Sequence, residues 1–191
     1  MVHTPPPSPQ TLRLRLGLPA EMTLVRDIDN DACDHYASAG LPVELAADHP
    51  FTVDEQARWT ADAAAGRLYM AELSPAEASG PVGFLCYHWV DGVPYLDQLS
   101  VRRAFMRRGI GTTMIGHAKA WAATTSTVGE LWLTTYDHIP WNRPYYTHQG
   151  FEVVPEADCG PEIRAILKFQ RESLPAPEAR IAMRFTRGGA R

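Results

Sequence analysis

The sequence predicts an α/β protein, built as a mixed α+β sheet with helices packed against its faces. Two observations support this prediction. Amphipathic helical segments alternate with strand-like segments, and three consecutive strand segments are separated by short, turn-forming stretches. The chain has 191 residues, of which 45% are hydrophobic. A chain of this size and composition can bury a full core without disulfides or structural metals.

The ends of the chain differ from the rest in composition. The first ten residues, MVHTPPPSPQ, hold four prolines and lack the apolar core of a secretory signal. We therefore expect a disordered leader at residues 1–11, a single domain at 12–186 and a tail at 187–191. No apolar run is long enough to cross a membrane, so the cytoplasm is the expected location.

The N-terminal part predicts one strand and two helices. Leu12, Leu14, Leu16 and Leu18 alternate with other residues, which is the period of a strand. Apolar residues at helical spacing predict a helix over residues 20–39 that ends at Gly40. A second helix, capped by Thr52, is expected to close at Gly66.

Three strands are then expected to form an antiparallel meander. They lie at Leu68–Leu73, Val82–Val90 and Tyr95–Val101. The dipeptide Asp91-Gly92, placed between two apolar runs, is a strong signal for a hairpin.

The C-terminal half predicts alternating helices and strands. Ile110, Met114 and Ala118 share one face of a helix that runs from Gly109 to about residue 123. The remaining elements follow in chain order: strand Glu130–Tyr136, helix 142–149, strand Phe151–Val154, helix Pro161–Ser173 and strand Arg180–Phe185. Four tryptophans fall on apolar faces and are expected in the core: Trp59, Trp89, Trp121 and Trp132.

A basic loop stands out against an acidic chain. There are 18 Lys and Arg against 22 Asp and Glu, a net charge of −4, which argues against nucleic acid or an anionic membrane as partner. Arginines nevertheless occupy positions 102, 103, 107 and 108, directly before a predicted helix start at Gly109. Free N–H groups at a helix start and nearby glycines favour a phosphate or pyrophosphate.

The common phosphate motifs do not match this loop. A Walker A loop requires Lys after its last glycine, but Thr112 follows Gly111; a dinucleotide fingerprint requires glycine where Met114 stands. The alternative is that the arginines are solvated and the glycines only turn the chain. The three cysteines, Cys33, Cys86 and Cys159, are too far apart for a common metal motif and are expected to be reduced thiols, with no metal bound.

Two segments together resemble the GNAT superfamily of acyl-CoA-dependent N-acetyltransferases. Met106-Arg107-Arg108-Gly109-Ile110-Gly111 resembles the Gln/Arg-x-x-Gly-x-Gly/Ala motif, with Met106 departing from the usual Gln or Arg. Pro140–Phe151 resembles the segment Asn…Tyr-x-x-x-Gly-Phe that follows the fifth strand. The resemblance spans residues 12–186 by element order and is sharp over 95–151. It implies a mostly antiparallel sheet that is splayed at the cofactor site.

The resemblance also implies a function. An acetyl group would pass from acetyl-CoA to an amine by direct attack in a ternary complex. The backbone of the strand would pair with the pantetheine arm, helix-start amides would hold the pyrophosphate, and Asn142 would contact pantetheine or cap its helix. The implied cofactor-binding residues are Leu99, Ser100, Val101, Arg107, Arg108, Gly109, Ile110, Gly111, Thr112, Asn142 and Tyr146.

Two catalytic residues are implied. Tyr146, four residues before Gly150, would protonate the leaving thiolate, while its neighbour Tyr145 would pack in the core. Strand alternation predicts Tyr95, Asp97, Leu99 and Val101 on one face, which makes Asp97 either the general base or a structural hydrogen-bonder. His88 and His138 are weaker candidates for base or acceptor contact.

Two other functions stay open at this point. One is a non-catalytic, CoA-binding sensor of the same fold, and the other is a nucleotide-phosphate binder unrelated to CoA. The sequence does not identify the acceptor amine or the oligomeric state, although a homodimer is the commonest soluble assembly.

Overall fold

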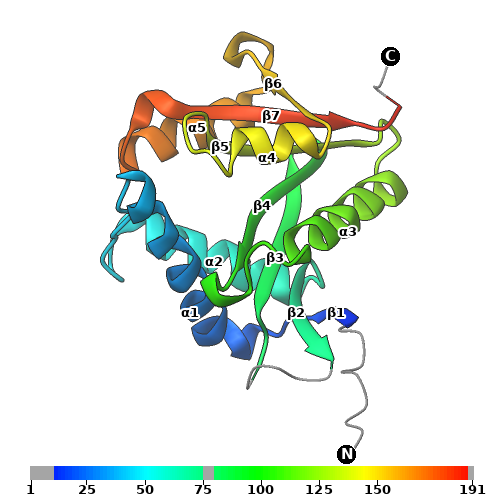
Figure 1. Ribbon diagram of the computed structural model, residues 1–191. Helices are drawn as coiled ribbons and strands as arrows, with labels where there is room; N and C mark the ends of the chain where they lie inside the picture. Colours follow the sequence, from blue (N-terminus) through cyan, green and yellow to red (C-terminus); the bar gives the residue numbers. More distant parts are fainter. Residues whose placement is uncertain (1–10, 75–79, 189–191) are drawn as a thin grey trace, which may run out of the picture.

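The computed structural model describes residues 11–74 and 80–188, so most of the expected leader and residues 189–191 of the expected tail lie outside it. One mixed sheet runs through the molecule in the order β1-β2-β3-β4-β5-β7-β6 (Figure 1). β4 and β5 pair in parallel and the other neighbours are antiparallel. The strands are β1 Thr11–Leu16, β2 Leu68–Ser74, β3 Gly83–Val90, β4 Val93–Val101, β5 Glu130–Tyr136, β6 Phe151–Val154 and β7 Arg180–Thr186.

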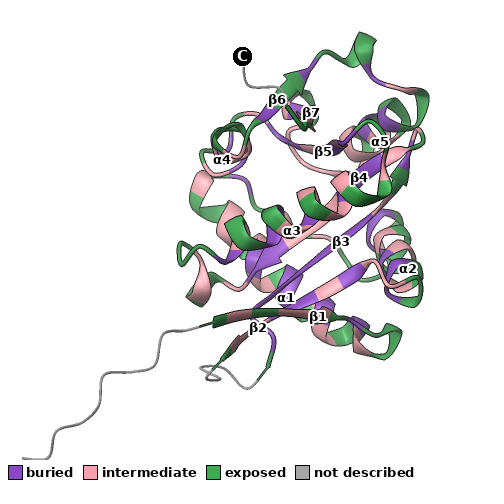
Figure 2. Ribbon diagram, turned by 90° about the vertical axis from the view of Figure 1, so that its right-hand side faces the viewer, coloured by how far each residue is buried: buried purple, intermediate pink, exposed green. Residues whose placement is uncertain are grey.

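Helices cover both faces of this sheet, as the sequence predicts. α2 and α5 lie on one side of it and α4 on the other (Figure 2). The helices are α1 Met22–Cys33, α2 Pro50–Ala64, α3 Ile110–Thr125, α4 Arg143–His148 and α5 Pro161–Ser173. Among the described helices none is both long and apolar enough to span a membrane.

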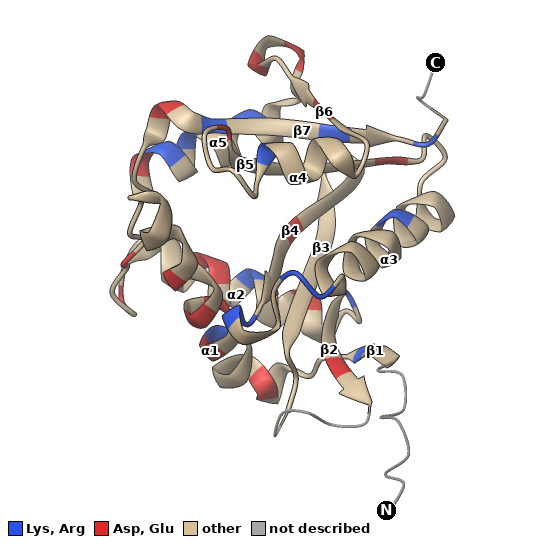
Figure 3. Ribbon diagram, in the orientation of Figure 1, with Lys and Arg blue, Asp and Glu red and all other residues tan. Residues whose placement is uncertain are grey.

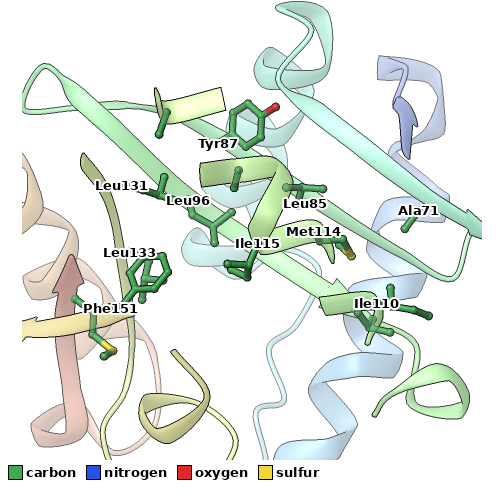
Figure 4. Packing of buried hydrophobic residues seen from close by; sticks show 14 of the residues in the cluster. Ala71, Leu85, Tyr87, Leu96, Ile110, Met114, Ile115, Leu131, Leu133 and Phe151 are labelled. Carbon is green, nitrogen blue, oxygen red and sulfur yellow. The ribbon is translucent and has the colours of Figure 1, made fainter. Parts of the chain in front are cut away.

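The largest core lies between α3 and the centre of the sheet. Ile110, Met114 and Ile115 of α3 pack against Leu85 and Leu96 of the strands (Figure 4). All five side chains are buried. This packing fixes the start of α3 against the end of β4, which is where the sequence places the basic loop.

Two helix boundaries differ from the prediction. The helix expected over residues 20–39 ends at Cys33, and a 3₁₀-helix, Asp34–Ala39, completes the segment. Gly40, with φ at 74°, ends it in the left-handed conformation as expected. The cap of α2 is His49 and not Thr52, because Nδ1 of His49 accepts the N–H of Phe51 at 3.2 Å.

The predicted hairpin is confirmed, but one tryptophan near it was misplaced. Asp91 and Gly92 have φ of 52° and 73°, as a type I′ turn requires. Trp89 is 43% exposed because it lies at the hairpin end of β3, opposite Pro94. Trp59 and Trp132 are buried, and the half-buried Trp121 stacks on Tyr87, so only the prediction for Trp89 is wrong.

A β-bulge interrupts β4. Gln98 pairs with Cys86 of β3, whereas Leu96 pairs with the next residue, Tyr87, so Asp97 is left without a partner. The bulge breaks the alternation that was expected to place Asp97 on one face with Leu99 and Val101. Leu99 and Val101 pack in the core under α3, but Asp97 contacts α2 on the opposite face.

β4 and β5 diverge at the middle of the sheet. Tyr95 and Trp132 form the single register pair that joins these two described strands. The remainder of β4, towards Val101, runs away from β5 (Figure 1). The sheet is therefore splayed beside the loop that precedes α3, as the resemblance implies.

Candidate functional site

A cavity of about 930 Å³ occupies the gap where β4 and β5 diverge. This volume is within the usual range for a site that binds a cofactor or a small ligand. It brings together nearly all of the sequence-predicted site residues: Asp97, Leu99, Ser100, Val101, Arg107, Gly109, Ile110, Gly111, Thr112, Asn142 and Tyr146. Arg108 is the predicted residue that does not line it.

The start of α3 presents free backbone N–H groups to this cavity. Gly109 precedes the helix with φ at 79°, and no side chain caps it. Thr113 makes the first helical hydrogen bond, to the carbonyl of Gly109 at 3.1 Å, so the amides of residues 110–112 precede the helical ladder. Such amides, aligned with the helix dipole, favour an anion.

The four arginines of the loop do not act as one charged patch. Arg103 is neutralised by Asp34 at 3.0 Å and by Asp31 at 3.4 Å. Arg102 donates to the carbonyl of Pro81 and Arg108 to that of Ala104. Two of these four arginines, Arg103 and Arg107, line the cavity. Of these two, Arg107 has no ion pair to a described residue.

Gly111 allows a tyrosine to approach the start of α3. A Cβ at this position would lie 3.0 Å from the hydroxyl of Tyr145. Tyr145 packs against the core under α3, as expected, and its buried hydroxyl has no hydrogen-bond partner among the described residues. A side chain at position 111 would therefore require the hydroxyl of Tyr145 to move.

Tyr146 lines the cavity and packs against aromatic neighbours. Its ring packs edge-on against Tyr145 and Phe151, with centroids 5.4 Å and 5.7 Å away. Burial raises the pKa of Tyr146 above the usual tyrosine value, with smaller contributions from neighbouring tyrosines. The phenol is therefore protonated at neutral pH and can donate a proton or a hydrogen bond.

The exposed edge of β4 offers main-chain groups rather than side chains. Beyond Tyr95 this strand has no ladder partner in β5, so its backbone can accept an extended ligand as an added strand. The side chain of Ser100 is not available to such a ligand, because its hydroxyl donates to Oδ1 of Asp29 at 2.7 Å.

Asn142 lies in the wall of the cavity and occupies the N-cap position of α4. Its side chain makes no capping bond to α4, although the residue directly precedes that helix. Instead, Nδ2 donates to the hydroxyl of Tyr36 at 3.0 Å. Asn142 therefore stands at the cap position, as the alternative expected, but its buried side-chain amide does not cap the helix and lies in the cavity wall.

Two side chains of α2 bind the carboxylate of Asp97. Its Oδ2 accepts the indole N–H of Trp59 at 3.0 Å, and its Oδ1 lies 3.4 Å from Nη2 of Arg58. The carboxylate lines the cavity, so both predicted roles remain compatible with its position.

Two further carboxylates, which the sequence did not predict as site residues, line the cavity on the same side as Asp97. Glu55 of α2 lies 2.8 Å from Nη1 of Arg26, and burial raises its pKa to about 8. Asp29 of α1 accepts bonds from Gln98 and Ser100, and burial raises its pKa as well. Nothing in the local sequence marks either residue, because acidic side chains on amphipathic helices usually face solvent.

The two histidine candidates do not line the cavity. His88 is bound to Asp62 through Nδ1 at 3.1 Å, and His138 is exposed after β5. Asp62, Cys86 and Asp97 place possible metal-ligand atoms within 4.8 Å of one another. However, the carboxylate of Asp62 is already bound by Arg67 and His88, and that of Asp97 by Trp59.

Known proteins share this architecture. Residues 27–151 match the model of the Acetyltransferase (GNAT) family. Among solved structures, the PaiA N-acetyltransferase of Thermoplasma acidophilum, in complex with coenzyme A, is 11% identical with a TM-score of 0.62. The alignment covers 93% of this chain and 99% of that one.

Two further acetyltransferase structures show the same fold. One from Thermus thermophilus is 19% identical with a TM-score of 0.59, over 93% of this chain and 97% of its own. One from Staphylococcus aureus is 12% identical with a TM-score of 0.64, over 92% and 99%. The family model spans well over half of the 191 residues, including the splayed strands and the start of α3. The chain therefore belongs to the GNAT acetyltransferase family.

Proposed function

We propose that this protein transfers an acetyl group from acetyl-CoA to the primary amine of a small molecule or peptide. One observation carries the proposal: a single cavity joins the uncapped start of α3, the unpaired edge of β4 and the phenol of Tyr146. Membership of an acetyltransferase family supports it.

The residues that would hold acetyl-CoA suit its chemistry. The amides at the start of α3, with Arg107 beside them, would bind the pyrophosphate. The backbone of Leu99 and Val101 would pair with the amide-rich pantetheine arm, and Asn142 would contact it from α4. This arrangement would direct the thioester to the gap between β4 and β5, next to Tyr146.

In the proposed reaction, the amine nitrogen attacks the thioester carbonyl in a ternary complex. A C–N bond forms, the C–S bond breaks, and the electron pair leaves with sulfur. Tyr146 donates its proton to the departing thiolate, since the phenol is protonated at neutral pH and has a proton to give.

The proton lost by the amine would pass to a carboxylate on the α2 side of the cavity. Asp97 is the candidate from the sequence, and its contacts with Trp59 and Arg58 fix its position. Glu55 is the candidate that the structure adds, because a pKa of about 8 suits a base that works near neutral pH. We infer that Glu55 accepts the proton and that Asp97, through its contacts with Trp59 and Arg58, holds α2 against β4.

The test is acetyl-CoA-dependent thiol release over a panel of amines, amino acids, aminoglycosides and peptides, combined with calorimetric binding of CoA, ATP and NAD. Saturable CoA binding and thiol release with at least one acceptor are the expected results. CoA binding without release across the panel would favour a sensor of the same fold. Binding of ATP or NAD but not CoA would contradict the proposal at its first step.

A further inference from the structure

A buried arginine lies in the cavity wall away from the start of α3. Arg180 is the first residue of β7 and is 7% exposed. Its Nε and Nη2 both donate to Oε1 of Gln170, at 3.2 Å and 2.7 Å, and its guanidinium lies 4.5 Å from the ring centroid of Tyr136. These neutral contacts hold the planar group in one orientation at the cavity surface.

Arg180 lacks a carboxylate partner. No Asp or Glu of the described residues lies within 4.0 Å of its nitrogens, and burial lowers its pKa. Arginine nevertheless stays charged in proteins, so this is a buried positive charge balanced only by dipoles and an aromatic ring. Buried charges are normally paired because leaving them unpaired is unfavourable.

Three other arginines of the same cavity are paired, whereas Arg107, beside the start of α3, also lacks an ion pair to a described residue. Arg26 lies 2.8 Å from Glu55, and Arg58 lies 3.4 Å from Asp97. Arg103 is paired with Asp34. The chain thus supplies a carboxylate for each of the paired arginines and supplies none for Arg180.

The position of Arg180 separates it from the proposed CoA phosphates. β7 begins beside α5, well away from the loop that leads into α3 (Figure 1). The wall across the cavity carries Asp29, Glu55 and Asp97, whose carboxyl oxygens can accept hydrogen bonds from an ammonium group. Figure 3 shows many acidic residues on α1 and α2, and both basic and acidic residues around α5.

We propose that Arg180 binds a carboxylate of the acceptor, so that the acceptor is an amine that also carries a carboxylate, such as an amino acid or a short peptide with a free C-terminus. The inference rests on the proposed acetyltransferase function and names its substrate class. Nε and Nη2 of Arg180 are bound to Gln170, and Nη2 also donates to Oγ1 of Thr134 at 3.4 Å, whereas Nη1 has no hydrogen-bond partner among the described residues and can donate to a carboxylate. The amine of the same molecule would then face Tyr146 and the acidic wall.

The test compares acids with their amides. Binding of N-acetylglycine, N-acetylalanine and N-acetylglutamine to the CoA-saturated protein is measured by calorimetry, beside binding of the three corresponding amides. At least one acid is expected to bind ten-fold or more tightly than its amide. Arg180→Met should remove this preference while leaving the Kd of CoA unchanged, and Arg180→Lys should retain part of it.

The matched control is Arg184→Met, which changes an arginine of the same strand that pairs with Glu130 outside the cavity. It should keep the preference for acids. Equal binding of acids and amides, binding of neither, or an unchanged preference in Arg180→Met would overturn the inference. Failure of the proposed function is distinguishable, since it would appear as no CoA binding, or as no thiol release with either acids or amides of free amino acids.

Discussion

The hydroxyl of Tyr145 lies 3.0 Å from the position that a Cβ on Gly111 would occupy. Tyr145 of α4 therefore lies close to the start of α3, which is the proposed pyrophosphate site. We therefore expect Gly111→Ala to displace the helix start from Tyr145 and to weaken CoA binding by roughly ten-fold, about 1.4 kcal/mol. Calorimetric titration with CoA measures the change directly.

Two variants test this explanation of Gly111. Gly116→Ala changes an exposed glycine in the same helix with no atom within 4 Å of the added Cβ, so it should raise the free energy of unfolding by about 0.5–1 kcal/mol and leave CoA affinity unchanged. Tyr145→Phe removes the opposing oxygen, so the double variant with Gly111→Ala should recover part of the lost affinity. Strictly additive losses would show that the contact is unimportant.

Tyr146→Phe should abolish proton donation without emptying the core. The ring keeps its edge-on contacts with Tyr145 and Phe151, and only the hydroxyl is lost. We expect kcat to fall by about 10²-fold or more while the Kd of CoA changes little. Steady-state thiol release and calorimetry measure the two quantities, and a kcat within two-fold of the parent value would remove Tyr146 from the mechanism.

The pH dependence of kcat/KM distinguishes Glu55 from Asp97. Because the pKa of Glu55 is about 8, its base form is populated only as the pH rises, so kcat/KM should increase up to a plateau above about pH 8. Glu55→Gln should remove this limb and lower the plateau by 10²-fold or more. Asp97→Asn should keep the limb; the opposite pattern in the two variants would assign the base to Asp97.

Glu55 should also make the folded protein less stable as the pH rises from about 5 to 8. Its folded-state pKa of about 8 lies above the ordinary glutamate value of 4.5, so between these values the folded state binds more protons than the unfolded state. The contribution of Glu55 is fully present below about pH 4.5 and is lost as the pH rises through about 8. Urea unfolding at pH 5 and pH 8 should therefore show a larger loss of stability in the parent than in Glu55→Gln.

The comparison between parent and variant isolates this effect. Glu21 acts in the opposite direction, because its pKa is lowered, chiefly by its hydrogen bond with Arg15. Asp29, whose pKa burial raises, acts in the same direction as Glu55, but Glu21 and Asp29 are both present in the parent and in the variant. If parent and Glu55→Gln lose equal stability from pH 5 to pH 8, the raised pKa of Glu55 is contradicted.

Local patterns predicted most of the fold. Pro161–Ser173 and Glu130–Tyr136 form the helix and strand expected at those positions, because the apolar period and the flanking turn residues agree. The hairpin at Asp91-Gly92 and the loop before Gly109 were also predicted, since each depends on residues adjacent in sequence. The family resemblance placed Tyr146 and Asn142 at one cavity for the same reason.

The features that sequence patterns did not predict depend on long-range packing. The bulge at Asp97 arises where β4 pairs with β3 on either side of this residue, and it reverses the face that simple alternation assigns to Asp97. Glu55 and Arg180 are separated by more than a hundred residues and meet at one cavity only in the folded chain. Trp89 is apolar and lies in a strand, but the surface around the hairpin leaves it exposed.

The single register pair between β4 and β5 has a consequence for how the molecule responds to solvent. Elsewhere, ladder hydrogen bonds protect strand amides, but along this seam the facing amides of β4 and β5 lack that protection. We expect them to exchange with deuterium faster than those of β3 or β7. A bound ligand that fills the seam should slow this exchange, which would give a label-free signal of occupancy independent of turnover.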